Sequence, residues 1–140
     1  MSTSFDPEEV LALWFGDLDA DGRSDEAHAK RWYTKDQGFD QLLRERFGAT
    51  YDAVSSDRCE SWLESPRGRL AYVIVLDQFS RNMFRGTAKM FEQDARAREV
   101  VREGIRRGVD KQLAFSERGF FYMPLMHSES IEDQDQCQTA

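Results

Sequence analysis

The chain has few cysteines, no excess of positive charge and no long apolar run. Its two cysteines, Cys59 and Cys137, are too few for a disulfide framework and lack the spacing of metal ligands. The 19 Lys and Arg residues face 26 Asp and Glu residues, for a formal net charge of −7, so the charge that neutralises nucleic-acid phosphates is missing. No apolar run approaches the roughly 18 residues of a membrane-spanning helix, and the N-terminus lacks a secretory signal. We therefore expect a cytoplasmic protein without nucleic-acid or membrane partners.

The sequence also lacks the alternating apolar and polar runs, bounded by hairpin turns, that are typical of β-strands. Its apolar residues recur at helical spacings instead. At 140 residues, with 40% apolar and 32% charged residues, the chain has the length and composition of one globular domain. We predict a single all-α domain over residues 1–140, built from about six or seven helices.

The most apolar segment covers residues 65–86. Ser65 and Pro66 are typical of an N-cap and a first helical residue, and Gly86 stands where a glycine ends a helix. Between them, apolar residues cover most of the circumference at about 100° per residue. A helix that is apolar nearly all round is usually buried, so we expect this one at the centre of the fold.

One arc of this helix, which we call the polar arc (residues 77–85), differs from the rest. Asp77 and Arg81 have i,i+4 spacing, which brings their side chains together. The stripe at i, i+3, i+4 and i+7 consists of Gln78, Arg81, Asn82 and Arg85. Buried polar groups need partners, because leaving one unpaired costs roughly 1–3 kcal/mol. Those partners decide whether the arc is a binding site or a structural network.

Capping residues and apolar spacings predict further helices on both sides of the central one. They are expected over residues 6–16, 24–33 with Ser24 as the cap, 39–55, 59–63 as a short turn, 90–108 and 116–126. Two positions leave alternatives open. Gly48 either allows a close helix contact or kinks the third helix, and Pro124 either kinks the last helix or begins a new one.

Several segments, spread in order over nearly the whole chain, resemble the signatures of a known family. They are residues 13–16, Trp62 with residues 65–68, residues 76–82 (Leu-Asp-Gln-Phe-Ser-Arg-Asn), residues 91–94 and residues 121–129. The family is the mostly bacterial, uncharacterised one catalogued as domain of unknown function 924. The resemblance implies a tetratricopeptide-like array of paired antiparallel helices, an α–α superhelix, and no established reaction.

Two departures from the family pattern matter. Ser80 stands where the pattern usually has proline, which we expect to relax the helix locally. Family members also continue with further helices after the His-Ser-Glu segment, so we expect the chain to be C-terminally incomplete relative to the family. The surface that those helices would cover consists of Phe120, Phe121, Leu125 and Met126. We expect it to be open and to mediate self-association; the alternative is that the polar tail caps the array.

The candidate site combines the polar arc with the His-Ser-Glu segment. Its residues are Asp77, Gln78, Arg81, Asn82, Arg85, His127, Ser128 and Glu129. They meet if the last helix packs antiparallel to the central one. Arginine forks bind carboxylate or phosphate, so such a pocket would suit an anionic ligand, with His127 as a general acid or base. The alternative is that these groups only pair with one another and fix the register of helix packing.

The sequence contains no established catalytic or metal-binding motif. His127 and Glu129 do not have the His-Glu-x-x-His arrangement, and neither a glycine-rich phosphate loop nor a Gly-x-Ser-x-Gly elbow occurs. We therefore predict no metal and no cofactor, and leave enzymatic activity open. Two functions remain: a helical scaffold that binds a peptide or protein partner, or a small-molecule site for an anionic ligand, binding or enzymatic, at the polar arc.

Overall fold

The computed structural model describes residues 5–127, in which helices form every regular element and no strand occurs. The α-helical segments of this part are α1 (Pro7–Phe15), α2 (Glu26–Tyr33), α3 (Gln37–Ser55), α4 (Pro66–Val73), α5 (Ser80–Met83), α6 (Asp94–Arg106) and α7 (Phe115–Met126). Short 3₁₀ turns are η1 (Glu60–Glu64), η3 (Ala88–Phe91) and η4 (Asp110–Gln112), whereas η2 (Ile74–Phe79) is π-helical. The prediction of an all-α fold is confirmed.

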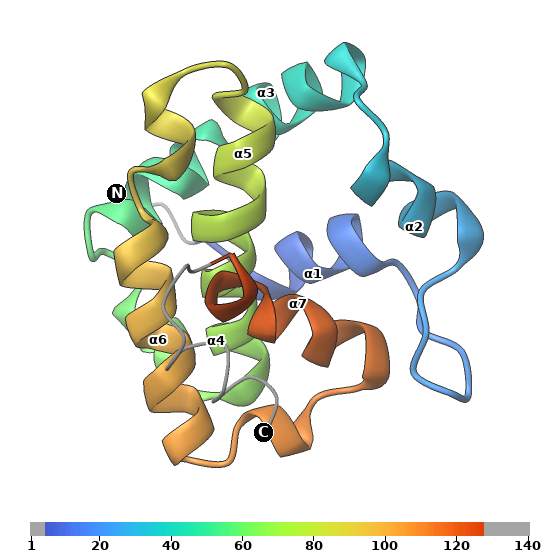
Figure 1. Ribbon diagram of the computed structural model, residues 1–140, viewed down its shortest axis with the longest axis vertical. Coiled ribbons are helices and arrows are strands. Elements are labelled where there is room, and N and C mark those ends of the chain that lie inside the picture. Colours follow the sequence, from blue (N-terminus) through green and yellow to red (C-terminus); the bar gives the residue numbers. More distant parts are fainter. Residues whose placement is uncertain (1–4, 128–140) are drawn as a thin grey trace.

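The consecutive segments α4, η2 and α5 form one helical rod, residues 66–83, in the middle of the molecule (Figure 1). Ser65 Oγ accepts a hydrogen bond from the Gly68 amide at 3.0 Å, and Pro66 is the first helical residue, as predicted. The rod ends at Met83, and Gly86 follows with a φ of +84°. Residues 68–77 are all buried. The rod is thus the centre of the core.

The middle of the rod is π-helical, which the apolar periodicity does not predict. The Ser80 amide donates to the Val75 carbonyl, five residues back, and the Ser80 hydroxyl donates to the Leu76 carbonyl at 2.6 Å. The π-turn ends immediately before Ser80, and the local relaxation expected from serine in place of proline stays a prediction. Such turns are rare and occur frequently at functional sites.

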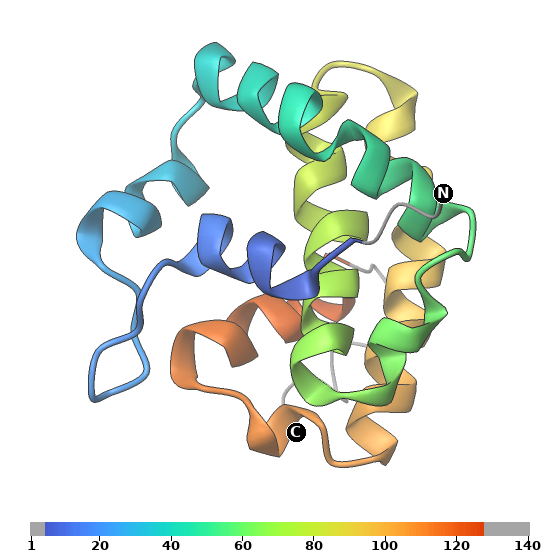
Figure 2. The ribbon, with the colours of Figure 1, turned by 180° about the vertical axis from the view of Figure 1, so that it is seen from behind.

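The other helices pack around this rod. α1 and α3 cross one side of it (Figure 2), α7 lies across the other, and α6 runs antiparallel beside it (Figure 1). At the start of α7, the buried carboxylate of Glu117 accepts from the Ala114 amide at 3.0 Å and from Arg67 Nη1 at 2.9 Å. This carboxylate joins the first turns of α4 and α7.

Capping side chains set the starts of α1, α2 and α3. Asp6 caps α1 as predicted. The cap of α2 is Asp25 rather than the predicted Ser24, because Asp25 Oδ1 accepts from the His28 amide at 2.8 Å, whereas the Ser24 amide donates to a hydroxyl of α7. Pro124 lies inside α7, which continues through it and does not begin a new helix there.

The surface expected to be open is mostly covered. Phe120, Phe121 and Leu125 are buried, and of the four residues named for this surface Met126 alone is exposed. α2 supplies part of the cover, because the Trp32 ring lies 4.6 Å from that of Phe120. The expectation of an open surface is therefore wrong for three of the four residues.

Candidate functional site

Asp77 is the centre of one polar cluster on the rod. Its side chain is 1% exposed. Arg81 Nη1 donates to Asp77 Oδ1 at 2.9 Å and to the Asp77 carbonyl at 2.8 Å. The same guanidinium donates to both carboxylate oxygens of Asp94 in α6, at 3.0 and 3.1 Å, and Gln78 donates to Asp77 Oδ2 at 2.7 Å. Arg81 thus joins a buried carboxylate of the rod to a carboxylate of α6.

His127 reaches this cluster from the end of α7. Its Nε2 atom lies 3.5 Å from Asp77 Oδ2, and its side chain is 35% exposed. The structure therefore brings His127 and the polar arc together, as the candidate site requires. Ser128 and Glu129, which complete the candidate site, lie outside the described residues.

A second cluster lies further along the rod, around Asp40 of α3. Asn82 Nδ2 donates to Asp40 Oδ1 at 2.9 Å. Arg85 donates to both oxygens of the same carboxylate, at 2.9 and 3.3 Å. Hydrogen bonding to Asp40 raises the pKa of Arg85, with burial acting in the opposite direction. The polar arc is therefore divided between two carboxylate-centred clusters.

Both arginines of the candidate site are bound to carboxylates of the chain itself. An anion would have to displace Asp94 from Arg81 or Asp40 from Arg85, or bind beside these pairs. Networks of this kind fix helix register whether or not a ligand binds. An anionic ligand at the polar arc stays a prediction.

Asp40 and Asp94 have no place in the predicted site, although each is essential to one cluster. Asp40 carries a signal in the sequence, because it lies three and seven residues before Leu43 and Phe47, on the buried face of α3. An acid on an apolar face needs a polar partner. Asp94 carries a similar signal, because it lies three and seven residues before Ala97 and Val101, which are buried in α6.

A groove of about 420 Å³ lies between α2 and α7, and nothing in the sequence predicts it. We call it the α2–α7 groove. It is lined by Trp32, Tyr33, Phe115, Ser116, Arg118, Gly119, Phe120, Tyr122, Met123 and Met126. Four large apolar side chains are more than half exposed in the part of the chain that the structure describes, and three of them line this groove: Tyr33 (81%), Phe115 (57%) and Met126 (56%).

Two arginines lie at this groove, whereas the Asp110 carboxylate that accepts from the Tyr122 hydroxyl is 1% exposed. Of the described residues that line it, Arg118 is the one charged side chain. The guanidinium of Arg118 donates to the backbone carbonyls of Asp110 and Leu113. The Arg23 guanidinium carbon lies 4.2 Å from the centroid of the Phe115 ring, in cation–π contact. The groove is thus an apolar surface with a basic rim on an acidic protein.

Residues 5–127 contain neither a metal-ligand cluster nor a membrane-spanning helix. In this range, no three His, Cys, Asp or Glu side chains come together as ligands of a metal ion would. No helix there combines the length and the apolar character needed to cross a membrane.

These features define a class: an all-helical protein with a buried central rod and an exposed apolar groove. The chain belongs to the family described as "bacterial protein of unknown function (DUF924)", whose model matches residues 10–140. It is similar to a solved structure of a protein of unknown function from Agrobacterium tumefaciens, with 34% identity and a TM-score of 0.81, over 94% of this chain and 69% of that one. No curated protein matches this chain.

Proposed function

We propose that the chain is a tetratricopeptide-like helical scaffold of the bacterial cytoplasm that binds an acidic, amphipathic peptide segment in the α2–α7 groove. One observation carries the proposal: Tyr33, Phe115 and Met126 are all more than half exposed and line the same groove. Contiguous exposed apolar surface on a soluble domain marks an interaction site. Aromatic residues and methionine are also the types enriched at interfaces.

The chemistry of the groove indicates the kind of partner. Apolar side chains of the partner would replace water on the exposed rings, which is favourable by about 25 cal/mol per Å² of apolar surface buried. The guanidiniums of Arg23 and Arg118 at the rim would attract carboxylates. Helical arrays present such surfaces to peptides, and an amphipathic helix fits an apolar groove through residues spaced i, i+3, i+4 and i+7.

Binding of two designed peptides tests the proposal. Both have the same apolar helical face, but the polar face carries Glu and Asp in one and Lys and Arg in the other. Fluorescence anisotropy of each labelled peptide is followed as the full chain is titrated. We expect the acidic peptide to bind saturably and more tightly, and added salt to weaken it because exposed charges are screened.

Variants of exposed residues locate the binding surface. Tyr33→Ser and Met126→Ser should each lower the affinity for the acidic peptide by about tenfold if their side chains are anchors. Phe91→Ser is the matched control, because Phe91 is 54% exposed but does not line the groove. Equal binding of both peptides, no saturable binding, or equal losses in the Phe91 and Tyr33 variants would contradict the proposal.

The self-association predicted from the sequence is a competing use of the same surface, because Met126 lies in the groove. Light scattering of the wild type and of Tyr33→Ser separates the two. A mass that doubles with concentration in the wild type and stays at 16.3 kDa in the variant would show that a second copy, and not an acidic peptide, fills the groove.

A further inference from the structure

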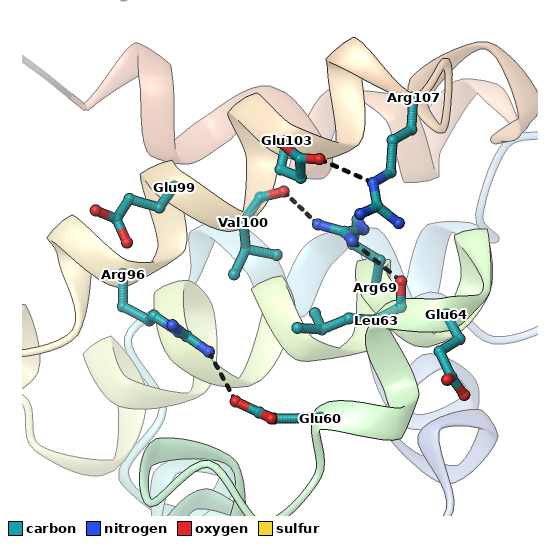
Figure 3. A pocket seen from close by; sticks show the side chains of 9 residues that line it. All are labelled: Glu60, Leu63, Glu64, Arg69, Arg96, Glu99, Val100, Glu103 and Arg107. Atoms are coloured by element: carbon teal, nitrogen blue, oxygen red, sulfur yellow. Dashed lines mark hydrogen bonds and ion pairs between the residues drawn. The ribbon is translucent and has the colours of Figure 1, made fainter.

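A second groove, of about 410 Å³, lies between η1 and α6 and is lined mainly by charged side chains (Figure 3). We call it the η1–α6 groove. Its charged lining consists of Arg69 of α4, Arg96 of α6 and Arg107, which caps the end of α6, together with Glu60, Glu64, Glu99 and Glu103. It lies apart from the α2–α7 groove, and the two share no lining residue.

Arg69 is a buried cation without a counterion among residues 5–127. It is 4% exposed. Its Nη1 donates to the Val100 carbonyl at 2.9 Å and its Nη2 to the Leu63 carbonyl at 3.1 Å. Its Nε is buried and has no hydrogen-bond partner in the described part of the chain. No carboxylate of the described residues forms an ion pair with it. Burial lowers the pKa of Arg69, the charge of Arg107 lowers it further, and Glu103 opposes both.

The packing around this side chain makes room for it. A Cβ atom at Gly104 of α6 would lie 2.8 Å from Arg69 Cδ, so the stem of the arginine passes where another residue type would block it. Burying an unpaired charge costs several kcal/mol. Two carbonyls offset part of this cost, but they leave the net charge of the guanidinium uncompensated.

Arg107 adds a second guanidinium at the same end of the groove, where Figure 3 shows the two groups beside each other. Its Nε donates to Glu103 at 2.9 Å, and its side chain is 61% exposed. Glu103 also binds Arg106, so one carboxylate is shared between two arginines there. At the other end of the groove, Glu60 faces Arg96 at 3.8 Å. Among the described residues, Glu103 is thus the one lining carboxylate that forms ion pairs at the end near Arg69, and Arg69 itself pairs with no carboxylate.

We propose that Arg69 and Arg107 form a binding site for a small oxyanion, either a carboxylate or a phosphate group. A bound oxyanion supplies the counter-charge that Arg69 lacks and accepts charge-assisted hydrogen bonds from two guanidiniums. Arg69 is the fixed part of the site, held by the Leu63 and Val100 carbonyls, and Arg107 is the part that solvent reaches. This proposal does not depend on the proposed peptide binding, because the two grooves share no lining residue.

Nuclear magnetic resonance on the full chain tests this site. Inorganic phosphate and succinate are titrated separately at constant ionic strength, and the Arg69 Nε–Hε signal is followed with the amides of Val100 and Glu103. We expect saturable shifts with at least one of these anions. The two titrations distinguish the ligand class. Phosphate saturates at the lower concentration if the site binds phosphate groups, and succinate does so if it binds carboxylates.

Two neighbouring variants separate a site from a general charge effect. Arg107→Gln should lower the affinity for the anion by about tenfold, because a charge-assisted hydrogen bond is lost. Arg106→Gln is the matched control: both side chains are 61% exposed and bind Glu103, but Arg106 does not line the groove. No saturable shift with either anion, or equal weakening in both variants, would show that Arg69 only clamps η1 to α6 and would overturn the proposal.

Discussion

Arg81 holds the Asp77 cluster together, so its removal tests whether the polar arc is structural. Arg81→Ala leaves a carboxylate that is 1% exposed without its cation, and breaking a buried ion pair from one side costs about 3–5 kcal/mol. His127→Ala removes a partly exposed group at 3.5 Å, and should cost less than about 1 kcal/mol. Urea unfolding of the two variants measures the free energies.

A double variant provides a second test of the Asp77 cluster. Asp77→Asn in the Arg81→Ala background removes the unpaired charge, and should recover part of the lost stability because a neutral amide is cheaper to bury. A second measurement is the rise in melting temperature that anionic metabolites cause in the wild type. If Arg81→Ala has the wild-type free energy of unfolding but shows no such rise, the guanidinium binds a ligand and the structural interpretation is wrong.

Residue-level prediction succeeds where partners are close in the sequence. The i,i+4 spacing of Asp77 and Arg81 implies their contact, which the structure shows at 2.9 Å. Their neighbours in space do not follow from spacing, because Asp94 and Asp40 belong to other helices. Arg69 could have been noticed, since it shares a helix face with the buried Val73 and has no acid at a helical spacing within its own helix.

At the scale of the helices, two glycines make a matched pair of substitutions. A Cβ at Gly104 would lie 2.6 Å from Phe121 Cζ and 2.8 Å from Arg69 Cδ. Gly104→Ala should therefore destabilise the chain by about 1–3 kcal/mol, the usual cost of overpacking. Gly48 meets nothing within 4 Å, so Gly48→Ala should stabilise α3 by about 0.5–1 kcal/mol. Thermal unfolding of both variants gives the sign of each effect.

Gly104 and Gly48 occupy similar helical environments by sequence. The opposite changes in stability predicted for their alanine variants come from tertiary packing alone. Equal stabilisation by both alanines would mean that α4 and α6 are not packed as closely as the structure has them. The close contact expected as one alternative at Gly48 does not occur. Helix starts are more predictable, because capping at Asp6 and Ser65 is local chemistry. The predicted end at Gly86 is wrong, since the last helical residue is Met83 and its C-cap is Phe84. The π-turn at Ile74–Phe79 cannot be predicted from the sequence in this way, because its residues keep the apolar pattern of an α-helix.

For the molecule as a whole, composition and periodicity predict one helical core around residues 65–86, and the structure has one. The exposed surface is harder to predict, since the sequence does not show which apolar faces meet. The sequence predicts Phe121 and Leu125 at an open surface, whereas the structure has both fully buried. Tyr33 and Phe115, far apart in the chain, were not expected to form a groove and do. Assembly of distant helices, and not local preference, decides both outcomes.

The single-domain prediction has a direct test in Cys59, whose thiol is buried in the common core. Burial raises the pKa of this thiol, with Arg58 opposing, so the reactive thiolate is both scarce and inaccessible in the folded chain. In a Cys137→Ser variant, where Cys59 is the one thiol, labelling with a disulfide reagent should be more than about 1,000-fold slower than in the unfolded chain, given ordinary domain stability. The rate should rise with urea along the same slope as global unfolding. A rate that does not change at low urea would show that the η1 region opens separately from the rest, and the chain would then not unfold as one cooperative unit.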